Sequence, residues 1–410
     1  MDILENLKER GFVEQCSDEQ ELKKLLSASK VVFYIGFDAT ADSLHVGHLI
    51  PIMIMAHLQK AGHVPIALIG GGTTLIGDPS GKTEMRRIIS LEEIKKNSEK
   101  LLVQFKRFLS FEKGKGMLLD NADWLSNLKY IDFLRDIGKY FRVNEMIKHE
   151  GYKLRMERET GLSFIEFNYQ LLQAYDFLHL FENYNCQLQI GGGDQWGNIL
   201  AGVGLIRQKT GKTAYGLTIP LLTTSDGTKM GKTEAGAVWL DAKKFSPYQF
   251  YQFWINTEDN DVIRFLKIFT FLPMEKINEL AKLTGAELRK VKEILAFEIT
   301  KIAHGEKEAE KARASSKAVF AKGGEDLASL PTTILSNAEV TKGIPILDLL
   351  LEIKLAPSKS EGARLIKQGG VYINDKKIES INLIIKADSF KNNSLLLRKG
   401  KKQYKRVIIR

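Results

Sequence analysis

The chain holds only two cysteines in 410 residues, Cys16 and Cys186, and they lie far apart in the sequence. Two isolated thiols exclude a disulfide framework, and they also exclude a zinc site built from paired cysteines. Sparse, unpaired cysteines are typical of proteins from a reducing compartment. We therefore expect a cytoplasmic protein.

Long apolar runs are also missing. A membrane-spanning helix needs about 18 consecutive apolar residues. The most apolar run here, LIPIMIMAHL from Leu49, is interrupted by Pro51 and closed by His57, so we expect a buried helix. The first residues, MDILENLKERG, are charged and helical in pattern rather than signal-like. Together these features predict a globular protein without membrane association.

Acidic residues are scarce near the C-terminus. Residues 386–410 hold nine lysines and arginines against the single Asp388, and the whole chain carries a net charge of +10. Such runs are commonly solubilising tails. In LLLRKGKKQYKRVIIR, however, the charges are mixed with apolar β-formers, which indicates a pair of strands with a basic face. A basic face of this kind suits a polyanionic partner.

The segment YIGFDATADSLHVGHL, residues 34–49, reads as a strand, a tight loop and a helix whose first turn carries His45 and His48. Residues three apart share one helix face, and a helix N-terminus attracts anions through its free N–H groups. With Gly47 allowing close approach, this segment is a candidate phosphate cradle. Two ordinary histidines at a polar helix start are the alternative.

A second string, KMGKT, covers residues 229–233 and follows the turn sequence TTSDG. Its two lysines, three apart on a glycine-containing loop, are suited to neutralising charge on a leaving pyrophosphate. A solvated basic loop is the alternative for the string taken alone. The ordered pair of strings is far more specific than either one.

The length of the chain predicts two or three domains. Strands separated by helices from Val31 onward predict a Rossmann-like parallel sheet with ligands at the carboxyl ends of the strands. We expect an α/β catalytic domain over 1–246 with a helical insertion at about 90–160. A helical domain over 247–321, a Gly/Ser/Pro-containing linker over 322–341 and a small α+β domain over 342–410 then follow.

The segment FNYQLLQAYDFL places Tyr169, Gln173 and Asp176 at i, i+4 and i+7, on one face of a helix. Leu171, Leu172 and Phe177 are expected on the other side, in the core. A solvated outer face is the bland alternative, but this row contains no lysine or glutamate. A phenol, an amide and a carboxylate in a row suit a zwitterionic substrate such as an amino acid.

The two strings resemble the HIGH and KMSKS signatures of class I aminoacyl-tRNA synthetases. The whole chain is similar to the bacterial tyrosyl-tRNA synthetases, with GFDATADSLHVGHL, LIGDPSGK, QLLQAYDF, GGGDQWGN and DGTKMGKTE in the order of that family. The resemblance implies activation of tyrosine by ATP, release of pyrophosphate, and transfer of tyrosine to the terminal adenosine of its tRNA.

For tyrosine, the resemblance implies that Tyr169, Gln173 and Asp78 bind the ammonium group, while Asp176 and Tyr34 receive the phenolic hydroxyl. A site that hydrogen-bonds this hydroxyl rejects phenylalanine, because its polar groups would otherwise stay unpaired; that general rule was established on this same family. An indole offers only a donor, so the pair Asp176 and Tyr34 argues against the related tryptophan enzyme.

For ATP, the resemblance implies that Gln195 holds the reacting carboxylate against the α-phosphate. The implied ATP-binding residues are Gly36, Asp38, Gly47, His48, Gly192, Asp194 and Lys232. The residues implied to stabilise the transition state and the leaving pyrophosphate are Thr40, His45, His48, Lys82, Arg86, Lys229, Lys232 and Thr233. Mg²⁺ is expected only together with ATP, since no carboxylate cluster resembles a protein-built cage for a metal.

The C-terminal segment resembles an S4 RNA-binding domain, with two helices and a turn into a strand over residues 344–378. The implied RNA-binding residues are Lys359, Arg364, Lys399, Lys401, Lys402, Lys405 and Arg406. The family further implies a homodimer, with much of its interface on the insertion. A small structural cap is the alternative for this domain.

Two readings from other functional classes are not competitive with this one. A catalytically silent RNA-binding protein on this scaffold would have lost the phosphate-handling residues, yet Lys82, Arg86, Lys229 and Lys232 are present. A nucleotidyltransferase with a His-x-Gly-His string would leave the C-terminal domain unexplained. The chain departs from the family pattern at Ile35, where many relatives carry a cysteine that touches the ribose.

Overall fold

The structure, a computed structural model, falls into two compact units. The first comprises Met1–Lys244 and Glu258–Leu288, and the second comprises Phe245–Thr257 and Arg289–Arg410. The structure describes residues 2–78, 89–157, 161–225, 227, 230–233, 236–320, 332–374, 376–391, 393–400 and 403–409.

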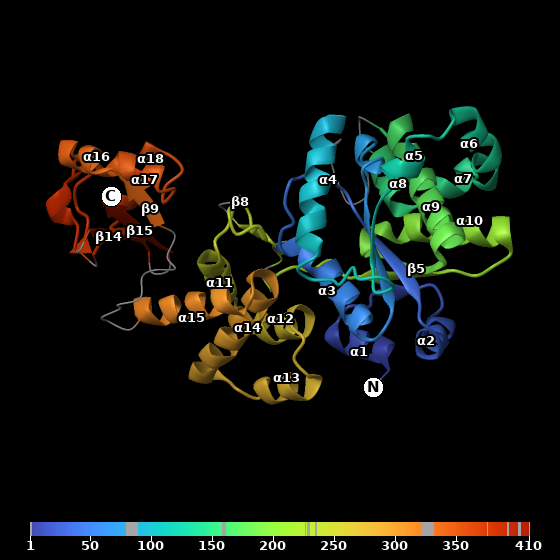
Figure 1. Cartoon of the computed structure of the whole chain (residues 1–410), viewed down its shortest axis with the longest axis horizontal. Helices are drawn as coiled ribbons and strands as arrows, with labels where there is room; N and C mark the ends of the chain where they lie inside the picture. The colour runs from blue at the N-terminus through green and yellow to red at the C-terminus, as the bar shows by residue number, and fades with distance from the viewer. Residues whose placement is uncertain are drawn as a thin grey trace. The chain divides into compact units, whose positions relative to one another are not determined.

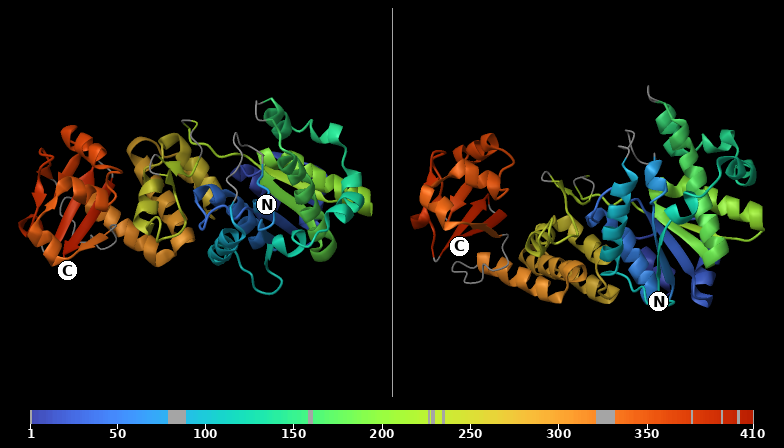
Figure 2. Two further views of the ribbon diagram at one scale, coloured as in Figure 1. Left: turned by 90° about the horizontal axis from the view of Figure 1, so that it is seen from above. Right: turned by 45° about the horizontal axis from the view of Figure 1, so that its top comes forward.

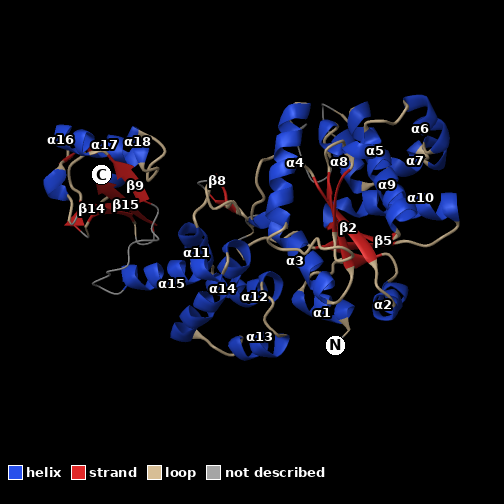
Figure 3. Ribbon diagram, in the orientation of Figure 1, coloured by secondary structure: helices blue, strands red, loops and turns tan. Residues whose placement is uncertain are grey.

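The first unit is built on a six-stranded sheet in the order β1-β6-β5-β2-β3-β4 (Figures 1 and 3). The strands β2 to β6 run parallel, and only the short β1 is antiparallel to its neighbour β6. The sheet thereby confirms the expected Rossmann-like α/β fold. The strands are β1 (Gln15–Cys16), β2 (Val32–Phe37), β3 (Val64–Ile69), β4 (Met117–Asp120), β5 (Cys186–Gly192) and β6 (Tyr215–Ile219).

Helices cover both faces of this sheet (Figure 2). Helix α3 (Val46–Lys60) connects β2 to β3, and α10 (Trp196–Thr210) connects β5 to β6 in the opposite direction along the sheet. Since such crossovers are right-handed, the two helices lie on opposite faces. The expected buried helix from Leu49 is part of α3, which is buried nearly all round despite Pro51 in its interior.

The segment expected as a helical insertion also contributes to the sheet. It holds α4 (Leu91–Phe105), α5 (Ala122–Leu125), α6 (Tyr130–Asp136), α7 (Val143–Met146) and α8 (Glu150–Met156), but also β4, which pairs with β3. The long helix α9 (Phe164–Tyr184) then leads back to β5 and packs on α10. The region around residues 90–160, expected to be a helical insertion, therefore also contains β4, an edge strand of the sheet.

The helices after residue 246 are divided between the two units. Helices α12 (Val262–Phe269) and α13 (Met274–Leu280) belong to the first unit, with α1 (Ile3–Arg10) and α2 (Glu19–Ala28). Arg10 holds α12 by donating to the carbonyl oxygens of Lys267 and Thr270 at 2.9 and 3.1 Å. Helices α11 (Pro247–Ile255), α14 (Leu288–His304) and α15 (Glu306–Phe320) contribute to the second unit. The structure thus departs from the expected single helical domain over 247–321.

The C-terminal part contains a five-stranded sheet in the order β12-β11-β14-β15-β9. Its elements are β9 (Thr332–Leu335), α16 (Asn337–Lys342), β10 (Ile344–Pro345), α17 (Ile346–Glu352), α18 (Lys359–Lys367), β11 (Val371–Ile373), β12 (Lys376–Lys377), β13 (Ile384–Ile385), β14 (Ser394–Lys399) and β15 (Gln403–Ile409). The two helices, the turn and the strand expected over 344–378 are present.

One boundary of this domain differs from the expected one. The strand β9 pairs in parallel with β15, and Leu335 is buried in the domain core. Residues 332–342 thus belong to the domain, as the strand β9 and the helix α16, and not to the linker expected over 322–341. The polar composition of this stretch hid the strand, because β9 lies at a sheet edge and alternates exposed and covered residues.

No described helix is both long enough and apolar enough to cross a membrane.

Candidate active site

The first unit contains a cavity of about 430 Å³ at the carboxyl ends of β2, β3 and β5. The chain crosses from β2 to β3 in one direction and from β5 to β6 in the other, so the cavity lies where the strand order reverses. Open parallel sheets bind ligands at this point. The sequence-predicted residues that line the cavity are Tyr34, Gly36, Asp38, Thr40, His45, Gly47, His48, Asp78, Tyr169, Gln173, Asp176, Gly192, Asp194 and Gln195.

One end of the cavity is closed by the carboxylate of Asp176, on α9. The indole Nε1 of Trp124 donates to its Oδ1 at 2.7 Å, and the amide of Asn121 donates to its Oδ2 at 2.8 Å. Only 2% of Asp176 is exposed. Burial raises the pKa of this carboxyl to about 7, although the two donors act in the opposite direction.

Tyr34, at the centre of β2, faces the same end of the cavity. Its ring packs on Phe177 of α9 with a centroid distance of 5.4 Å. Its hydroxyl is buried, and none of the described residues forms a hydrogen bond with it. A buried hydroxyl without a partner is costly, so this group is poised for a polar atom of a ligand.

A chain of polar side chains lines the next part of the cavity. The amide of Gln195 donates to Asp78 Oδ2 at 2.8 Å. The amide of Asn198 donates to Gln173 Oε1 at 3.1 Å and to Gln195 Oε1 at 3.2 Å. Asn198 therefore fixes the orientation of both glutamine side chains, and leaves Asp78 and Gln173 beside Tyr169 at the cavity wall.

The two histidines of the first signature string form the N-terminus of α3. His45 is the N-cap residue, where we expected it in the first turn, and its Nδ1 accepts the Gly47 N–H at 3.0 Å. The Nδ1 of His48 in turn accepts the N–H of His45 at 3.1 Å, and the two rings lie with centroids 3.9 Å apart and planes tilted by 40°. These contacts leave the Nε2 atom of each ring as the hydrogen-bond donor.

Burial, followed by the proximity of His45, lowers the pKa of His48 to about 3. His48 is therefore neutral at physiological pH. A neutral imidazole at a helix N-terminus offers an anion an N–H dipole and no net positive charge.

The second signature string approaches the first through its glycine. Gly231 has a φ of 90°, and a side chain there would come within 2.9 Å of the Gly47 nitrogen. Both facts explain why glycine stands where the general motif has a serine. The short strands β7 (Lys232–Thr233) and β8 (Gly236–Ala237) pair directly after it.

Several predicted phosphate-handling residues cannot be placed. Lys82, Arg86 and Lys229 lie outside the described residues, and only the backbone of Lys232 and Thr233 is described. Among the residues that the structure does describe, no group of three or more histidine, cysteine or acidic side chains is arranged to hold a metal ion.

Sequence reasoning missed the residues that hold the binding groups in place. Asn121 and Trp124 lie more than fifty positions from Asp176 in the chain, so no local spacing connects them. Asn198 had a weak signal, because it follows Gln195 by three positions at the start of α10 and so shares its side of the helix.

The predicted RNA-binding residues do not share one face. In the β14–β15 pair, Lys405 lies opposite the buried Leu397, whereas Arg406 lies opposite Leu396 on the other side of the sheet. Burial lowers the pKa of Lys405. The expected strand pair is present, but its basic residues alternate between the two faces.

The charges of helix α18 have partners within the domain. Lys359 pairs with Asp348, and Arg364 forms two hydrogen bonds of 2.8 Å with Glu361. On the sheet, the guanidinium of Arg398 stacks on Tyr372 at 3.7 Å from the ring centroid. Lys401 and Lys402 lie outside the described residues.

Comparisons with known proteins agree with this geometry. A family model described as class I tRNA synthetases (W and Y) matches residues 26–321, and a model of the tyrosine--tRNA ligase SYY-like C-terminal domain matches residues 326–407. The chain therefore belongs to the class I tRNA synthetases of the tryptophan and tyrosine group, and it is an aminoacyl-tRNA synthetase.

Within that group, the chain is similar over its full length to tyrosine--tRNA ligases, and it shares their aminoacylation activity. The chain is 55% identical to the one from Caldanaerobacter subterraneus subsp. tengcongensis over 410 residues, which cover both chains completely. It is also 55% identical to the one from Acetivibrio thermocellus, over 99% of this chain and 98% of the relative. A solved C-terminally truncated mitochondrial tyrosyl-tRNA synthetase from Aspergillus nidulans superposes with a TM-score of 0.70 at 32% identity, covering 78% and 94% of the two chains.

Proposed function

We propose that the cavity binds tyrosine with its phenolic hydroxyl between Asp176 and Tyr34, and that the enzyme converts it to tyrosyl-adenylate and then to tyrosyl-tRNA. The observation that carries this proposal is the buried Asp176 carboxylate beside the unpartnered Tyr34 hydroxyl. Its two oxygens already accept bonds from Trp124 and Asn121, and each has a further lone pair. A phenol can donate to Asp176 and accept from Tyr34, which an indole cannot do.

The end of tyrosine that carries the ammonium and carboxylate groups meets the hydrogen-bonded polar side chains of the cavity wall. Asp78, Tyr169 and Gln173 bind the ammonium group, because a carboxylate, a phenol oxygen and an amide oxygen are all acceptors. Gln195, oriented by Asn198, holds the substrate carboxylate toward the α-phosphate of ATP. The enzyme thus fixes the nucleophile by its two ends.

Adenylate formation is an in-line attack of the tyrosine carboxylate on the α-phosphorus, which forms the P–O bond of the adenylate and expels pyrophosphate. No protein group acts as a nucleophile or a general base. Catalysis comes from orientation and from stabilising the charge that develops on the phosphates. Mg²⁺ enters with ATP, bound through the phosphate oxygens.

ATP lies along the strand ends. Gly36, Gly47 and Gly192 allow its close approach, and Asp38 and Asp194 accept hydrogen bonds from it. The neutral His48, together with His45 and Thr40, donates to the phosphates. Lys82, Arg86, Lys229, Lys232 and Thr233 neutralise the charge of the leaving pyrophosphate.

We propose further that two copies assemble through the segment after β4. Among the described residues, Tyr130, Ile131, Val143 and Phe164 each expose more than half of their side-chain area, at 57, 72, 60 and 68%. Exposed large apolar residues in one segment favour a protein interface there. The C-terminal domain binds tRNA, supported by its arginine and lysine side chains, among them Arg398 beside the half-buried Tyr372 and Tyr404. Cytoplasmic location is proposed from the two unpaired cysteines.

Amino-acid-dependent ATP–pyrophosphate exchange without tRNA tests the proposal, with tyrosine, phenylalanine and tryptophan compared side by side. We expect exchange with tyrosine alone. Exchange with tryptophan instead would overturn the roles of Asp176 and Tyr34. The absence of exchange with all three would favour a silent RNA-binding protein on this scaffold.

A further inference from the structure

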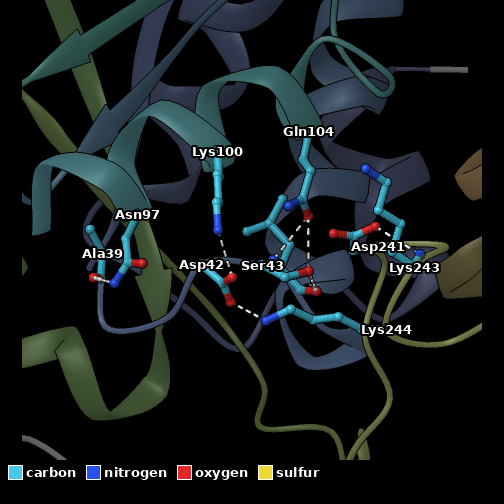
Figure 4. A network of polar contacts seen from close by, with 10 residues as sticks. Ala39, Asp42, Ser43, Asn97, Lys100, Gln104, Asp241, Lys243 and Lys244 are labelled. Atoms are coloured by element: carbon cyan, nitrogen blue, oxygen red, sulfur yellow. Dashed lines mark hydrogen bonds and ion pairs between the residues drawn. The ribbon is translucent and has the colours of Figure 1, made fainter. Parts of the chain in front are cut away.

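A group of polar side chains outside the substrate contacts joins three segments around the first signature string (Figure 4). We call this group the clasp. The three segments are the loop between β2 and α3, helix α4, and the stretch that follows β8. The clasp consists of Asp42, Ser43, Asn97, Lys100, Gln104 and Lys244.

Helix α4 holds the backbone of the loop at both ends. The amide of Asn97 donates to the Ala39 carbonyl oxygen at 2.9 Å, and Gln104 Oε1 accepts the Leu44 N–H at 3.0 Å. Asn97 and Gln104 are seven positions apart, so they share one helix face, and both are buried. The loop between these two anchors contains Thr40 and leads directly into His45.

Asp42, inside the same loop, joins the other two segments. Its Oδ2 accepts from Lys100 of α4 at 2.9 Å, and its Oδ1 pairs with Lys244. These two lysines lower the pKa of Asp42 to about 2, so the carboxylate is charged at every physiological pH. The ammonium of Lys244 also lies 4.8 Å from the ring centroid of Trp239.

The stretch before Lys244 runs beside both signature strings. The Val46 N–H donates to the Val238 carbonyl oxygen at 2.9 Å, and the Leu240 N–H donates to the Leu44 carbonyl oxygen at 2.9 Å. On its other side, the Val238 N–H donates to the Gly231 carbonyl oxygen at 3.0 Å. Residues 238–240 therefore form the backbone connection between the first string and the second.

We propose that the clasp is a positioning device for the step that expels pyrophosphate. The Asp42–Lys244 pair holds residues 238–240 in register with the first string, so that Thr40 and His45 keep their place relative to the backbone of Gly231 in the second string. This inference rests on the proposed function. The clasp residues tested below act through these groups and not by contacting the phosphates themselves.

A double-mutant cycle tests the central pair. Asp42→Asn, Lys244→Met and the double variant are compared by the single-turnover rate of tyrosyl-adenylate formation at saturating ATP and tyrosine. We expect each single variant to slow this rate by about three- to fivefold, as for a partly exposed ion pair. The dissociation constant for tyrosine should not change. The double variant should be no slower than the slower single variant, because both remove one interaction.

Matched controls separate positioning from loss of charge or stability. Lys243→Met removes a neighbouring charge whose described polar contact is through its backbone N–H, to Asp241 at 2.9 Å. Lys96→Met on α4 is the partner control for Lys100→Met, because Lys96 pairs with Glu92 on its own helix. Both controls should keep the wild-type rate, and Lys244→Arg should restore most of it.

Three outcomes would each overturn the inference. In the first, the rate losses of the two single variants multiply in the double variant. In the second, Lys243→Met loses as much rate as Lys244→Met, and in the third, the variants unfold more easily but keep the wild-type rate. If Asp42→Asn fails to fold, Lys100→Met tests the same inference, because it removes the other ion pair of Asp42. Wild-type protein without tyrosine-dependent exchange would instead overturn the proposed function.

Discussion

The carboxylate of Asp176 is held in the interior by two neutral donors rather than by a cation. Trp124 and Asn121 satisfy one lone pair on each oxygen, and apolar core residues such as Phe177 adjoin Asp176. At the scale of the residue, this arrangement leaves the carboxylate able to accept one more donor. It also makes its charge costly to the folded state.

That cost predicts a pH dependence of stability. The pKa of Asp176 is about 7 in the folded protein against a reference value of 3.8, so the folded state binds this proton more tightly than the unfolded chain. Stability from this group is therefore lost as the pH rises, by about 3 kcal/mol between about pH 5 and pH 8. Asp176→Asn should flatten this part of the profile, measured by urea unfolding. If the unfolding free energies of wild type and Asp176→Asn changed with pH in the same way, the pH dependence could not be assigned to Asp176.

The buried hydroxyl of Tyr34 leads us to predict selectivity for tyrosine over phenylalanine. Tyr34→Phe removes one neutral hydrogen-bond partner of the substrate hydroxyl, so kcat/KM for tyrosine should fall about fivefold while the value for phenylalanine does not fall. The ratio is measured by pyrophosphate exchange. Tyr152→Phe is the matched control, because its hydroxyl is bound to the Phe167 carbonyl oxygen at 2.9 Å. An unchanged ratio in Tyr34→Phe would place the phenol elsewhere.

At the scale of the element, α9 presents the row proposed to bind tyrosine because the start of this helix is fixed. Ser163 and Glu166 form a capping box, in which Glu166 Oε2 accepts the Ser163 N–H at 3.1 Å. Glu166 is also paired with the buried Arg155. The row Tyr169, Gln173 and Asp176 could be predicted from spacing alone, since a helix repeat places them together.

Loss of the cap should weaken this element. Ser163→Ala removes the acceptor for the Glu166 N–H and should lower the unfolding free energy by about 1 kcal/mol. Urea unfolding measures the change. Ser29→Ala, at the C-cap of α2, removes only an exposed hydrogen bond from the hydroxyl to the Leu25 carbonyl oxygen at 3.1 Å, and it should differ from wild type by less than about 0.5 kcal/mol. Equal effects at both serines would refute the argument from the capping box.

Other features of the elements could not be predicted from the sequence. Asn97 and Gln104 read as ordinary polar residues of a charged helix, because their burial depends on a loop more than fifty positions earlier in the chain. The edge strand β4 was likewise concealed, since its four residues are all only half-buried. Tertiary contacts decided both cases.

At the scale of the whole molecule, all described cavity residues belong to the first unit. The placement of β9 and of α12 escaped prediction because both join sheets or helices distant in sequence. A chain ending at Phe320 omits β9 together with its partner β15. We expect it to retain tyrosine-dependent exchange but to charge tRNA at least about hundredfold more slowly, because phosphate contacts are lost.

A chain ending at residue 341 is the structural control. It keeps β9 without β15 and exposes an unpaired strand that includes Ile334, so it should aggregate more readily. Unchanged tRNA charging by the chain ending at Phe320 would contradict the role of the C-terminal domain.

The parallel pairing of β9 with β15 also affects the order in which the domains fold during synthesis. During synthesis, domains fold in the order in which they emerge from the ribosome. All strands of the first sheet have been made once Ile219 is added, whereas β15 consists of residues 403–409. The nascent chain can therefore build its catalytic sheet well before the last strand of the C-terminal sheet has been made. The capacity to activate tyrosine should arise before the capacity to bind tRNA.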